Sequence, residues 1–418
     1  MARFLIVLGL AILTTTLKTL TNSPGMSHSC CINSWEGNMS VRKRKWITST
    51  GEAKEAWIID YVDQQGDRHI ETFERKKDAE ARHDIVRENV RQGVHTPANK
   101  SITVADAAED WIAYVEREGR ERSTVDQYRQ HVRLHINPVI GRKKLAELTT
   151  PGVNAFRDEL LDRLSRPMAR KVLVSLKSLL RDAQRRGNVS QNVATSVKIS
   201  ASKRDKRKLK VGVDIPTSDE IRRILHAAPD RWRQLLLVLT FAGLRSSEAR
   251  GLRWQDVDFK RGELHVRQRA DRYNNIGKPK SESGERAIPL GPHVLNTLRE
   301  WKLACPKGAL DLVFPTAEGG ILHRGSIAQR GLIPAQIAAG VVTKDGRAKY
   351  TGLHALRHFF ASWCINRKAD GGLELPLKVV QHRLGHSGIQ MTADVYGHLF
   401  PSGDDGTELA AAEEALLA

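Results

Sequence analysis

The sequence predicts a multidomain protein that is mainly α-helical and carries small β elements. A chain of 418 residues exceeds one ordinary domain, so two or three domains are expected. Apolar and polar residues alternate between Trp57 and Phe73, as they do in half-buried strands, whereas the apolar spacing from Thr103 onward is that of helices. A basic stretch from Ser200 to Asp214 has almost nothing to bury, which is typical of a linker between domains.

The chain is strongly basic, with 67 Lys and Arg residues, 48 Asp and Glu residues and a formal charge of +19. Because the surplus runs along the whole chain, a nucleic acid is the expected partner; a basic protein with a merely solvated surface is the alternative. The cysteines have neither the spacing of a zinc site nor the density of a disulfide scaffold, and they fit a reducing compartment. They are Cys30, Cys31, Cys305 and Cys364.

The first 38 residues hold an apolar run from Phe4 to Leu13, preceded by Arg3. The run is too short to span a bilayer, and no clear cleavage site follows it. Met39 opens a basic stretch that is typical of a natural start. We therefore expect residues 1–38 to be a mis-assigned or disordered extension, with an export or anchoring signal as the alternative.

Residues 40–97 are expected to form a small module of a β-hairpin or sheet with one helix. The alternating segment is interrupted from Gln64 to Asp67, which predicts a turn between two strands. A charged helix from Lys76 to Arg91 can then pack on the hairpin. A two-stranded ribbon needs such packing to persist.

Residues 101–190 are expected to form a domain of four helices, with Thr103 and Ser123 as N-caps of the first two. Their exposed faces carry more basic residues than solubility requires. We expect several of these residues to contact DNA: Arg129, Arg133, Lys171, Lys177 and Arg181.

Residues 191–213 are predicted to be a basic linker that contacts DNA, and a solvated linker without DNA contacts is the alternative. Its central residues can contact DNA phosphates: Lys206, Arg207 and Lys208. Thr217 and Glu220 have the spacing of a capping box, so a larger domain is expected from residue 214 to about residue 400. The tail, residues 401–418, is acidic and then apolar; it either docks elsewhere or frays.

An apolar helix from Leu235 to Phe241 is followed by Gly243, Leu244 and Arg245. An arginine just past a buried helix can be held rigidly. Glu248 can brace it by an ion pair, or it can be a plain surface carboxylate. The segment GLRSSEARGLRWQDVD resembles the first box of the tyrosine recombinase (phage integrase) family, in which the arginine binds the scissile phosphate.

Strands are predicted at Glu263–Val266 and Arg286–Leu290, and the hairpin tip between them carries two lysines. The stretch PKSESGERAIPL resembles the hairpin of the same family. Its register places the catalytic lysine at Lys280, with Lys278 as the alternative; Lys278 is also expected to contact DNA.

Further along, His354 and Arg357 are three residues apart and share one face if the segment is helical. Leu384-Gly385-His386-Ser387 follows, and Tyr396 stands ten residues after His386. These residues match the second box of the family in type, order and spacing.

The resemblance implies an α+β catalytic domain at residues 214–400, a SAM-like helical core-binding domain at 101–190 and an arm-type DNA-binding domain at 40–97. It implies a site-specific recombinase that cleaves and rejoins DNA through a 3′-phosphotyrosine, without metal or other cofactor. The catalytic residues that it implies are Arg245, Lys280, His354, Arg357, His386 and the nucleophile Tyr396.

The resemblance also implies partners: double-stranded DNA attachment sites, a homotetramer on DNA and accessory bending or directionality factors. The tail would dock on a neighbouring protomer. The extra N-terminal module favours an integrase of a prophage or mobile element, acting in the cytoplasm at the nucleoid and away from membranes. A catalytically inactive DNA-binding regulator of the same fold is the alternative.

The chemistry of these residue types supports the same reaction. A phenol that attacks a phosphodiester creates extra negative charge, which two guanidinium groups can bind. An ammonium at Lys280 can protonate the departing 5′-oxygen. His354 and His386 can serve as hydrogen-bond partners of the phosphate, and either can assist proton transfer from Tyr396.

Two other readings of the histidines and tyrosines are weaker. His354 with His358, and His382 with His386, have a spacing that could hold zinc, but a metal beside two arginines would be electrostatically strained. His358 and His382 are therefore expected to be structural or adjacent to DNA. The tyrosines other than Tyr396 lack neighbouring motifs with arginines and histidines, so they are not expected to be the nucleophile.

Overall fold

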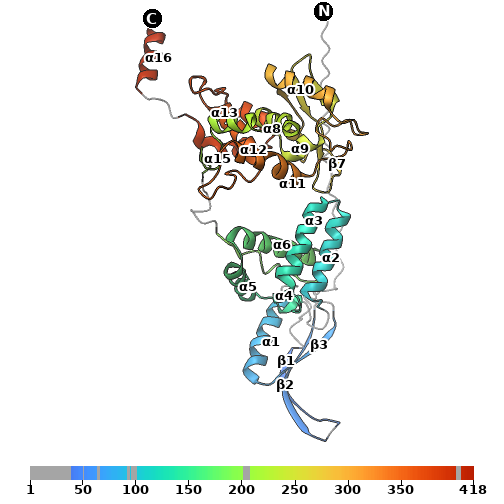
Figure 1. Cartoon of the computed structure of the whole chain (residues 1–418). Helices are drawn as coiled ribbons and strands as arrows, with labels where there is room; N and C mark the ends of the chain where they lie inside the picture. Colours follow the sequence, from blue (N-terminus) through green and yellow to red (C-terminus); the bar gives the residue numbers. More distant parts are fainter. Residues whose placement is uncertain are drawn as a thin grey trace, which may run out of the picture. The chain divides into compact units, whose positions relative to one another are not determined.

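The computed structural model describes residues 39–49, 51–63, 66–91, 95, 101–200, 208–401 and 406–418 (Figure 1). The chain divides into two compact units, Met1–Ile199 and Ser200–Ala418. The expectation for residues 1–38 and the expected phosphate contacts of Lys206 and Arg207 lie outside the described residues. The described part is mainly helical with small sheets, which confirms the predicted fold class.

The first unit opens with a three-stranded antiparallel sheet in the order β1-β2-β3, packed against one helix. Its elements are β1 (Ser40–Ile47), β2 (Ala53–Val62), β3 (Arg68–Phe73) and α1 (Lys76–Arg91). Ile59 and Tyr61 of β2 pack with Ala79 and Val86 of α1 in a small core. The predicted hairpin is β2 and β3. Alternation did not reveal β1, because the consecutive basic residues 42–45 conceal it.

The rest of the first unit is a set of packed helices. They are α2 (Val104–Arg117), α3 (Arg122–His131), α4 (Asn137–Ile140), α5 (Thr150–Arg163) and α6 (Arg166–Arg185). Thr103 caps α2 in a capping box with Asp106, as its position predicted. Ser123 is not a cap, because α3 starts at Arg122 and Glu121 is its N-cap residue. The core of these helices includes the fully buried Trp111.

The second unit is also mainly helical (Figure 1). Its longer helices are α7 (Ser218–His226), α8 (Asp230–Ala242), α9 (Ser246–Gly251), α10 (Pro292–Ala304), α12 (Ile333–Ala338), α13 (His354–Ile365), α14 (Leu377–Leu384), α15 (Ile389–Tyr396) and α16 (Thr407–Leu417), and α11 is a single turn (Arg324–Ser326). Thr217 and Glu220 form the predicted capping box at the start of α7.

Two small sheets lie between α9 and α10. The first has the order β4-β5-β8, and the second is the ribbon β6-β7. Their bounds are β4 (Val257–Asp258), β5 (Glu263–Val266), β6 (Arg269–Ala270), β7 (Ile276–Gly277) and β8 (Arg286–Pro289). The predicted strands β5 and β8 do pair, but the ribbon β6-β7 is inserted between them. Lys278 and Lys280 therefore do not occupy the tip of a single hairpin; they lie on the connection from β7 to β8.

The core of the second unit is built around α8 and α13, which pack against each other. Leu235, Leu236 and Leu239 of α8 are almost completely buried. On the other side of α13, Phe360 belongs to a second apolar cluster, which also contains the ring of Tyr396. The end of α13 and the end of α15 are thus fixed by the same cluster.

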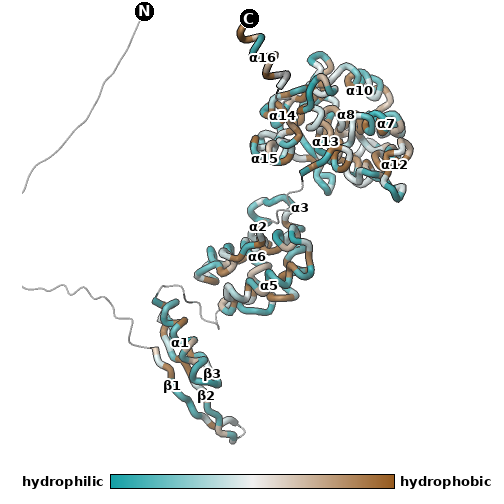
Figure 2. The backbone as a smooth tube through the Cα atoms, turned by 90° about the vertical axis from the view of Figure 1, so that its left-hand side faces the viewer, coloured by the Kyte–Doolittle hydropathy of each residue, from teal (hydrophilic) through white to brown (hydrophobic). Residues whose placement is uncertain are grey.

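The two ends of the second unit differ in how they are held. Leu209, near its start, packs against the core, and its carbonyl oxygen accepts a hydrogen bond of 2.7 Å from Nε2 of His398. The helix α16 carries hydrophobic and hydrophilic segments (Figure 2), and Leu416 and Leu417 are more than 80% exposed. None of the helices within the described residues is both long and apolar enough to traverse a bilayer.

Candidate active site

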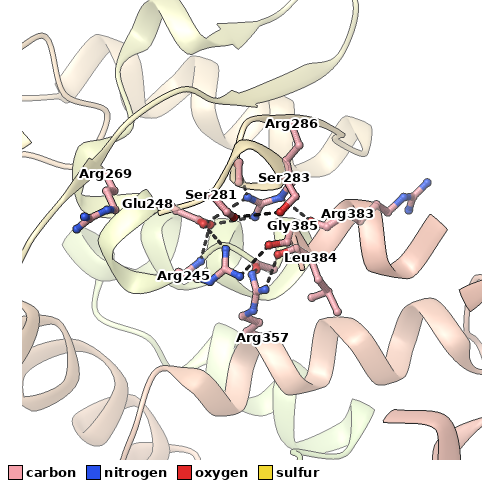
Figure 3. Close-up of polar contacts among 12 residues, drawn as sticks. Arg245, Glu248, Arg269, Ser281, Ser283, Arg286, Arg357, Arg383, Leu384 and Gly385 are labelled. Atoms are coloured by element: carbon pink, nitrogen blue, oxygen red, sulfur yellow. Dashed lines mark hydrogen bonds and ion pairs between the residues drawn. The ribbon is translucent and has the colours of Figure 1, made fainter. Parts of the chain in front are cut away.

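Arg245 is fixed at the junction of two helices. The helix α8 ends at Gly243, whose φ is +59°, and a Cβ atom there would lie 2.2 Å from the ring of Phe360, so only glycine fits. Arg245 is then the N-cap residue of α9, and its Nη1 donates to Oε1 of Glu248 at 2.7 Å. Its Nη2 donates to the carbonyl oxygen of Gly385 at 2.9 Å (Figure 3).

Glu248 lies in the interior and holds two arginines. Its side chain is only 3% exposed, so the alternative of a surface carboxylate is wrong and the predicted brace of Arg245 is confirmed. On its other side Nη2 of Arg286, a fully buried residue of β8, donates to Oε2 at 2.9 Å. Burial acts to raise the pKa of Glu248, but Arg286 and Arg245 outweigh it and hold that pKa below its usual value. The carboxylate is therefore charged at neutral pH.

Arg286 connects three segments of the second unit. Besides pairing with Glu248, it donates to the carbonyl oxygens of Arg383 at 2.7 Å and Gly284 at 2.9 Å. These contacts join α9, the connection before β8 and the end of α14 (Figure 3). The residue packs the lysine-bearing connection beside the arginines of the site.

Arg357, on α13, is 2% exposed and makes its contacts with the backbone. Its guanidinium donates to the carbonyl oxygen of Gly243 at 2.6 Å and to that of Leu384. Burial, and then the charge of Arg245, lower its pKa to about 9, so the group is still a cation at neutral pH.

The two arginines thus bind consecutive carbonyl groups, those of Leu384 and Gly385. Figure 3 shows Arg245, Arg286 and Arg357 gathered around Glu248 and this segment. Gly385 has φ of +63°, and a Cβ atom there would lie 2.8 Å from Nη1 of Arg286. The Leu-Gly-His-Ser segment therefore needs its glycine for two reasons, conformation and space.

His386 and Tyr396 lie next to this segment. The His386 ring is buried, and its Nδ1 lies 3.0 Å from Oγ1 of Thr392. Burial, and then Arg357 and Arg245, lower its pKa to about 4, so the imidazole is neutral at physiological pH. Its ring plane is 4° from that of Tyr396, with the centroids 6.4 Å apart.

The Tyr396 side chain is 2% exposed. Burial raises the pKa of its hydroxyl to about 12, although the nearby charges of Arg357 and Arg245 act to lower it. The hydroxyl oxygen lies 2.8 Å from Nδ1 of His358. The structure thus brings the phenol and both arginines into one region, which ties together residues up to 151 positions apart in the sequence.

His354, the first residue of α13, is exposed. Although part of the side chain reaches solvent, the residues packed around it desolvate the ring, and this effect, followed by the charges of Arg357 and Arg245, lowers its pKa below the usual value. Its ring meets that of His358 edge to face, with the centroids 5.0 Å apart. The four residues of the second box are therefore placed together, and His358, expected to be structural or adjacent to DNA, joins them through the hydroxyl of Tyr396.

The two candidates for the catalytic lysine lie at the edge of the candidate active site. Lys278 and Lys280 are exposed, and the carbonyl oxygen of Lys278 accepts a hydrogen bond of 3.1 Å from Arg269. The carbonyl oxygen of Ser283 lies 2.9 Å from the position that a Cβ on Gly385 would take, so their connection passes beside the arginines. The geometry does not choose between the two lysines.

The basic residues expected to contact DNA on the first unit are mostly at the surface. Arg133, Lys171 and Arg181 are exposed, as is Lys208 of the second unit. Arg129 forms an ion pair with Glu116, and the ammonium of Lys177 donates to a backbone carbonyl at 3.1 Å. These last two contacts would compete with a phosphate.

Sequence reasoning missed the roles of Arg286 and His358. Arg286 was recognised only as the start of a strand, and a lone arginine in a strand gives no sign that its partner is 38 residues away. For His358 a signal existed, since it stands one helical turn after His354. Among the residues that the structure describes, histidines, cysteines and carboxylates form no group of three or more arranged to hold a metal ion.

Comparison with known proteins gives consistent matches to one family. The phage integrase family matches residues 216–402, and the phage integrase central domain matches residues 104–200. A tyrosine recombinase XerC-like protein of Caldanaerobacter subterraneus subsp. tengcongensis is 26% identical over 353 residues, 78% of this chain and 86% of that protein.

Solved structures show the same fold at low identity. The Tn1549 transposon integrase in complex with a circular intermediate DNA is similar with a TM-score of 0.59 and 21% identity, over 76% of this chain and all of that one. A lambda integrase tetramer bound to a Holliday junction is similar with a TM-score of 0.53 and 18% identity, over 82% of this chain and 95% of that one.

Proposed function

The chain belongs to the phage integrase family of tyrosine recombinases, DNA recombination enzymes, and from this premise we propose that it is a site-specific integrase with Tyr396 as its nucleophile. It cleaves and rejoins DNA strands through a 3′-phosphotyrosine. We further propose that its substrate is a prophage or another mobile element. The similarity in fold to a transposon integrase and to lambda integrase supports this role.

One arrangement carries the catalytic part of the proposal: Arg245 and Arg357 bind the carbonyls of Gly385 and Leu384, directly before His386. The ring of His386 lies parallel to that of the buried Tyr396, with the centroids 6.4 Å apart. Each guanidinium has five N–H donors, and the contacts described above use two of them in each residue. Donors are left to bind the non-bridging oxygens of a phosphodiester as the phenol attacks.

In the proposed step the Tyr396 oxygen attacks phosphorus, and the bond from phosphorus to the 5′-oxygen breaks. Lys280, with Lys278 as the alternative, protonates that 5′-oxygen. His354 and His386 donate hydrogen bonds to the phosphate. The phosphotyrosine bond keeps the energy of the broken link, so religation by a 5′-hydroxyl reverses the step without metal or other cofactor.

The proposed partners follow from charge and from the relatives. Residues 40–97 would bind arm-type DNA sites, while residues 101–190 and 214–400 would hold the core site through their basic residues. A homotetramer is proposed by analogy with lambda integrase, whose tetramer was solved on a Holliday junction. We also propose accessory bending or directionality factors and a location in the cytoplasm at the nucleoid.

A trapping experiment tests the nucleophile. Purified protein is incubated with duplex DNA that carries the attachment site and a nick placed so that the cleaved fragment diffuses away. The wild type should accumulate a covalent protein–DNA adduct, and Tyr396→Phe should accumulate none. Tyr273→Phe, which removes a phenolic hydroxyl elsewhere in the same unit, is the control. Adducts formed equally by wild type and Tyr396→Phe would refute the assignment, and no adduct with either would favour the inactive regulator.

A further inference from the structure

His358 makes the closest polar contact to the proposed nucleophile. Its Nδ1 lies 2.8 Å from the hydroxyl oxygen of Tyr396, a distance suited to proton transfer. Among the described residues, His358 is the hydrogen-bond partner of the Tyr396 hydroxyl. The contact joins α13 to the last residue of α15, so it depends on the packing of two helices and not on a local turn.

The other two histidines of the site are less well placed to receive the hydroxyl proton. The Nδ1 of His386 is engaged with Thr392, and the ring lies parallel to the phenol instead of meeting its hydroxyl. His354 is exposed, and its ring contacts the ring of His358 edge to face. Both therefore remain suited to the phosphate, as proposed above.

The protonation state of His358 suits an acceptor. Burial, and then the charges of His354 and Arg357 on its own helix, lower its pKa to about 4, while Asp214, before α7, acts in the opposite direction. The ring is thus neutral at physiological pH. With its proton on Nε2, Nδ1 offers a lone pair to the phenol, which is itself protonated.

We propose that His358 is a further catalytic residue, the general base that receives the hydroxyl proton of Tyr396. The inference rests on the proposed function, because it assumes that Tyr396 attacks the phosphate. As the bond from oxygen to phosphorus forms, the O–H bond breaks and the proton moves to Nδ1. The resulting imidazolium holds the proton until religation returns it to the phenolate.

The arrangement makes the base dependent on substrate. Without a phosphate, the cations around His358 oppose its protonation, and the phenol stays neutral and buried. A bound phosphodiester brings one negative charge, and its transition state brings more, which offsets those cations and favours the imidazolium. Proton transfer is thereby coupled to the arrival of the scissile phosphate.

Two substitutions at His358 separate proton transfer from simple positioning. His358→Ala removes the contact. His358→Asn places an amide near the position of Nδ1, so it can keep a hydrogen bond to the hydroxyl but cannot act as a base at neutral pH. His293→Ala, which removes an exposed histidine of α10 in the same unit, is the control. Far-ultraviolet circular dichroism, thermal melting and DNA affinity establish that each variant folds and binds.

The measurement is the single-turnover rate of adduct formation on two substrates, ordinary DNA and DNA with a 5′-bridging sulfur at the scissile position. The sulfur leaves without a proton, so this second substrate removes the need for the lysine. We expect both His358 variants to be slower by about a hundredfold or more on both substrates, with His293→Ala unchanged.

The pH profile on the sulfur substrate adds an independent readout. Without a base, the rate of His358→Ala should rise about tenfold per pH unit between pH 7 and pH 9, because it follows the fraction of phenolate. The wild-type rate should be nearly flat over the same range, since its base is already neutral.

The outcomes distinguish this inference from the proposed function. Adduct formation by Tyr396→Phe overturns the proposed function itself. If Tyr396→Phe is inactive but His358→Ala equals the wild type, only the role of His358 is refuted. A wild-type rate for His358→Asn would reduce that role to holding the hydroxyl, and rescue of His358→Ala by the sulfur substrate would move it to the leaving group; either result overturns the general base.

Discussion

Individual buried charges decide whether this site can exist. Arg357 is nearly inaccessible, and its guanidinium is directed by two backbone carbonyls, those of Gly243 and Leu384. A planar fork is needed to reach both at once, and an ammonium cannot replace it. The shape of the group thus matters as much as its charge.

Arg357→Lys should slow adduct formation by about 10²- to 10³-fold, the usual effect of removing one preorganised donor from a site of developing negative charge. Gel shift on the core site should show affinity within a few fold of the wild type. Arg222→Lys, which changes an exposed arginine of α7, should leave both quantities unchanged. A rate near that of the wild type for Arg357→Lys would show that charge alone suffices.

Glu248→Gln should reduce the free energy of unfolding by about 3–5 kcal/mol, because it leaves the fully buried Arg286 without its counter-charge. Urea denaturation of the whole chain measures this. The matched control is Glu159→Gln, whose ion pair with Arg163 is exposed and should contribute about 0–1 kcal/mol. Equal losses in the two variants would contradict the proposed role of the buried pair.

Stability should also fall in acid. His358 and His386 have pKa values of about 4 in the folded chain against 6.5 ordinarily, so the unfolded chain binds their protons at higher pH. Their contribution to the free energy of unfolding is complete above pH 6.5, the ordinary pKa of histidine, and is lost as the pH falls from 6.5 toward 4. The pKa of Glu248 is also lowered, so its contribution is lost below its unfolded value. Denaturation at several pH values should show a steady decrease; a flat profile from pH 6.5 to 4 would contradict it.

The residues of the site could be predicted from the sequence where their spacing carried the information. Arg357 and Tyr396 belong to segments whose order and spacing resemble a known family, and the structure brings them together. The pairing of Glu248 with Arg286 could not be predicted in full, because it depends on the strand pairing that brings β8 next to α9. A contact between His358 and Tyr396 likewise depends on how α13 and α15 pack.

Among the elements, the end of α14 and the segment that follows it are held by contacts with both arginines. They supply the carbonyls of Leu384 and Gly385 to the two arginines and the ring of His386 to the phenol. The left-handed conformation of Gly385 turns the chain so that these groups face one region.

Gly385→Ala should lower both stability and the rate of adduct formation. The left-handed conformation alone costs roughly 1–2 kcal/mol with a side chain, and the added Cβ would also approach Arg286 within 2.8 Å. Gly388→Ala is a control in the same segment, since its φ is −144° and nothing lies within 4 Å of the added Cβ. Thermal melting and the trapping assay should separate the two; equal behaviour would show that Gly385 is not constrained.

Among the residues that the structure describes, the C-terminal helix α16 has no apolar partner for its last residues. An 11-residue helix such as α16 is marginal by itself, and its end leucines are exposed, so we propose that it docks on a neighbouring protomer. Removing residues 403–418 should leave binding of one protomer to one site unchanged and reduce assembly on two sites. Analytical ultracentrifugation with DNA measures both, and unchanged assembly would favour a frayed tail.

At this scale the sequence predicted long helices better than short strands. The helix α8 has many apolar residues and a glycine at its C-cap, whereas β6 and β7 have two residues each and no periodicity to detect. The ribbon that they form displaced the lysines from the expected hairpin tip. The strand prediction was therefore right about the pairing of β5 with β8 and wrong about the hairpin tip, while the choice of Lys280 from the family register stays a prediction.

At the scale of the whole molecule, each of the two units has its own apolar core. The division falls at the basic stretch that composition alone had marked, and the matched family regions lie on either side of it. The outer limits of the domains, 40–97, 101–190 and 214–400, remain predictions, because composition changes gradually there.

A fragment of residues 208–418 should therefore fold by itself, with one cooperative urea transition, while a fragment of residues 244–418, which lacks α7 and α8, should not. The first fragment should also bind core-site DNA more weakly and with a smaller dependence on salt than the whole chain, since fewer cations contact phosphates. Failure of the 208–418 fragment to fold would show that the two cores depend on each other.

The two arginines that bind neighbouring carbonyls have a consequence for the order of events on DNA. Folding has already restricted the rotation of both long side chains, so an incoming duplex does not have to immobilise them. In the proposed reaction, recognition of the target can then rest on the many cations at the surface, while Arg245 and Arg357 act on the phosphodiester bond that breaks. If the proposed roles hold, DNA affinity and turnover depend on different groups, so each could change in evolution without loss of the other.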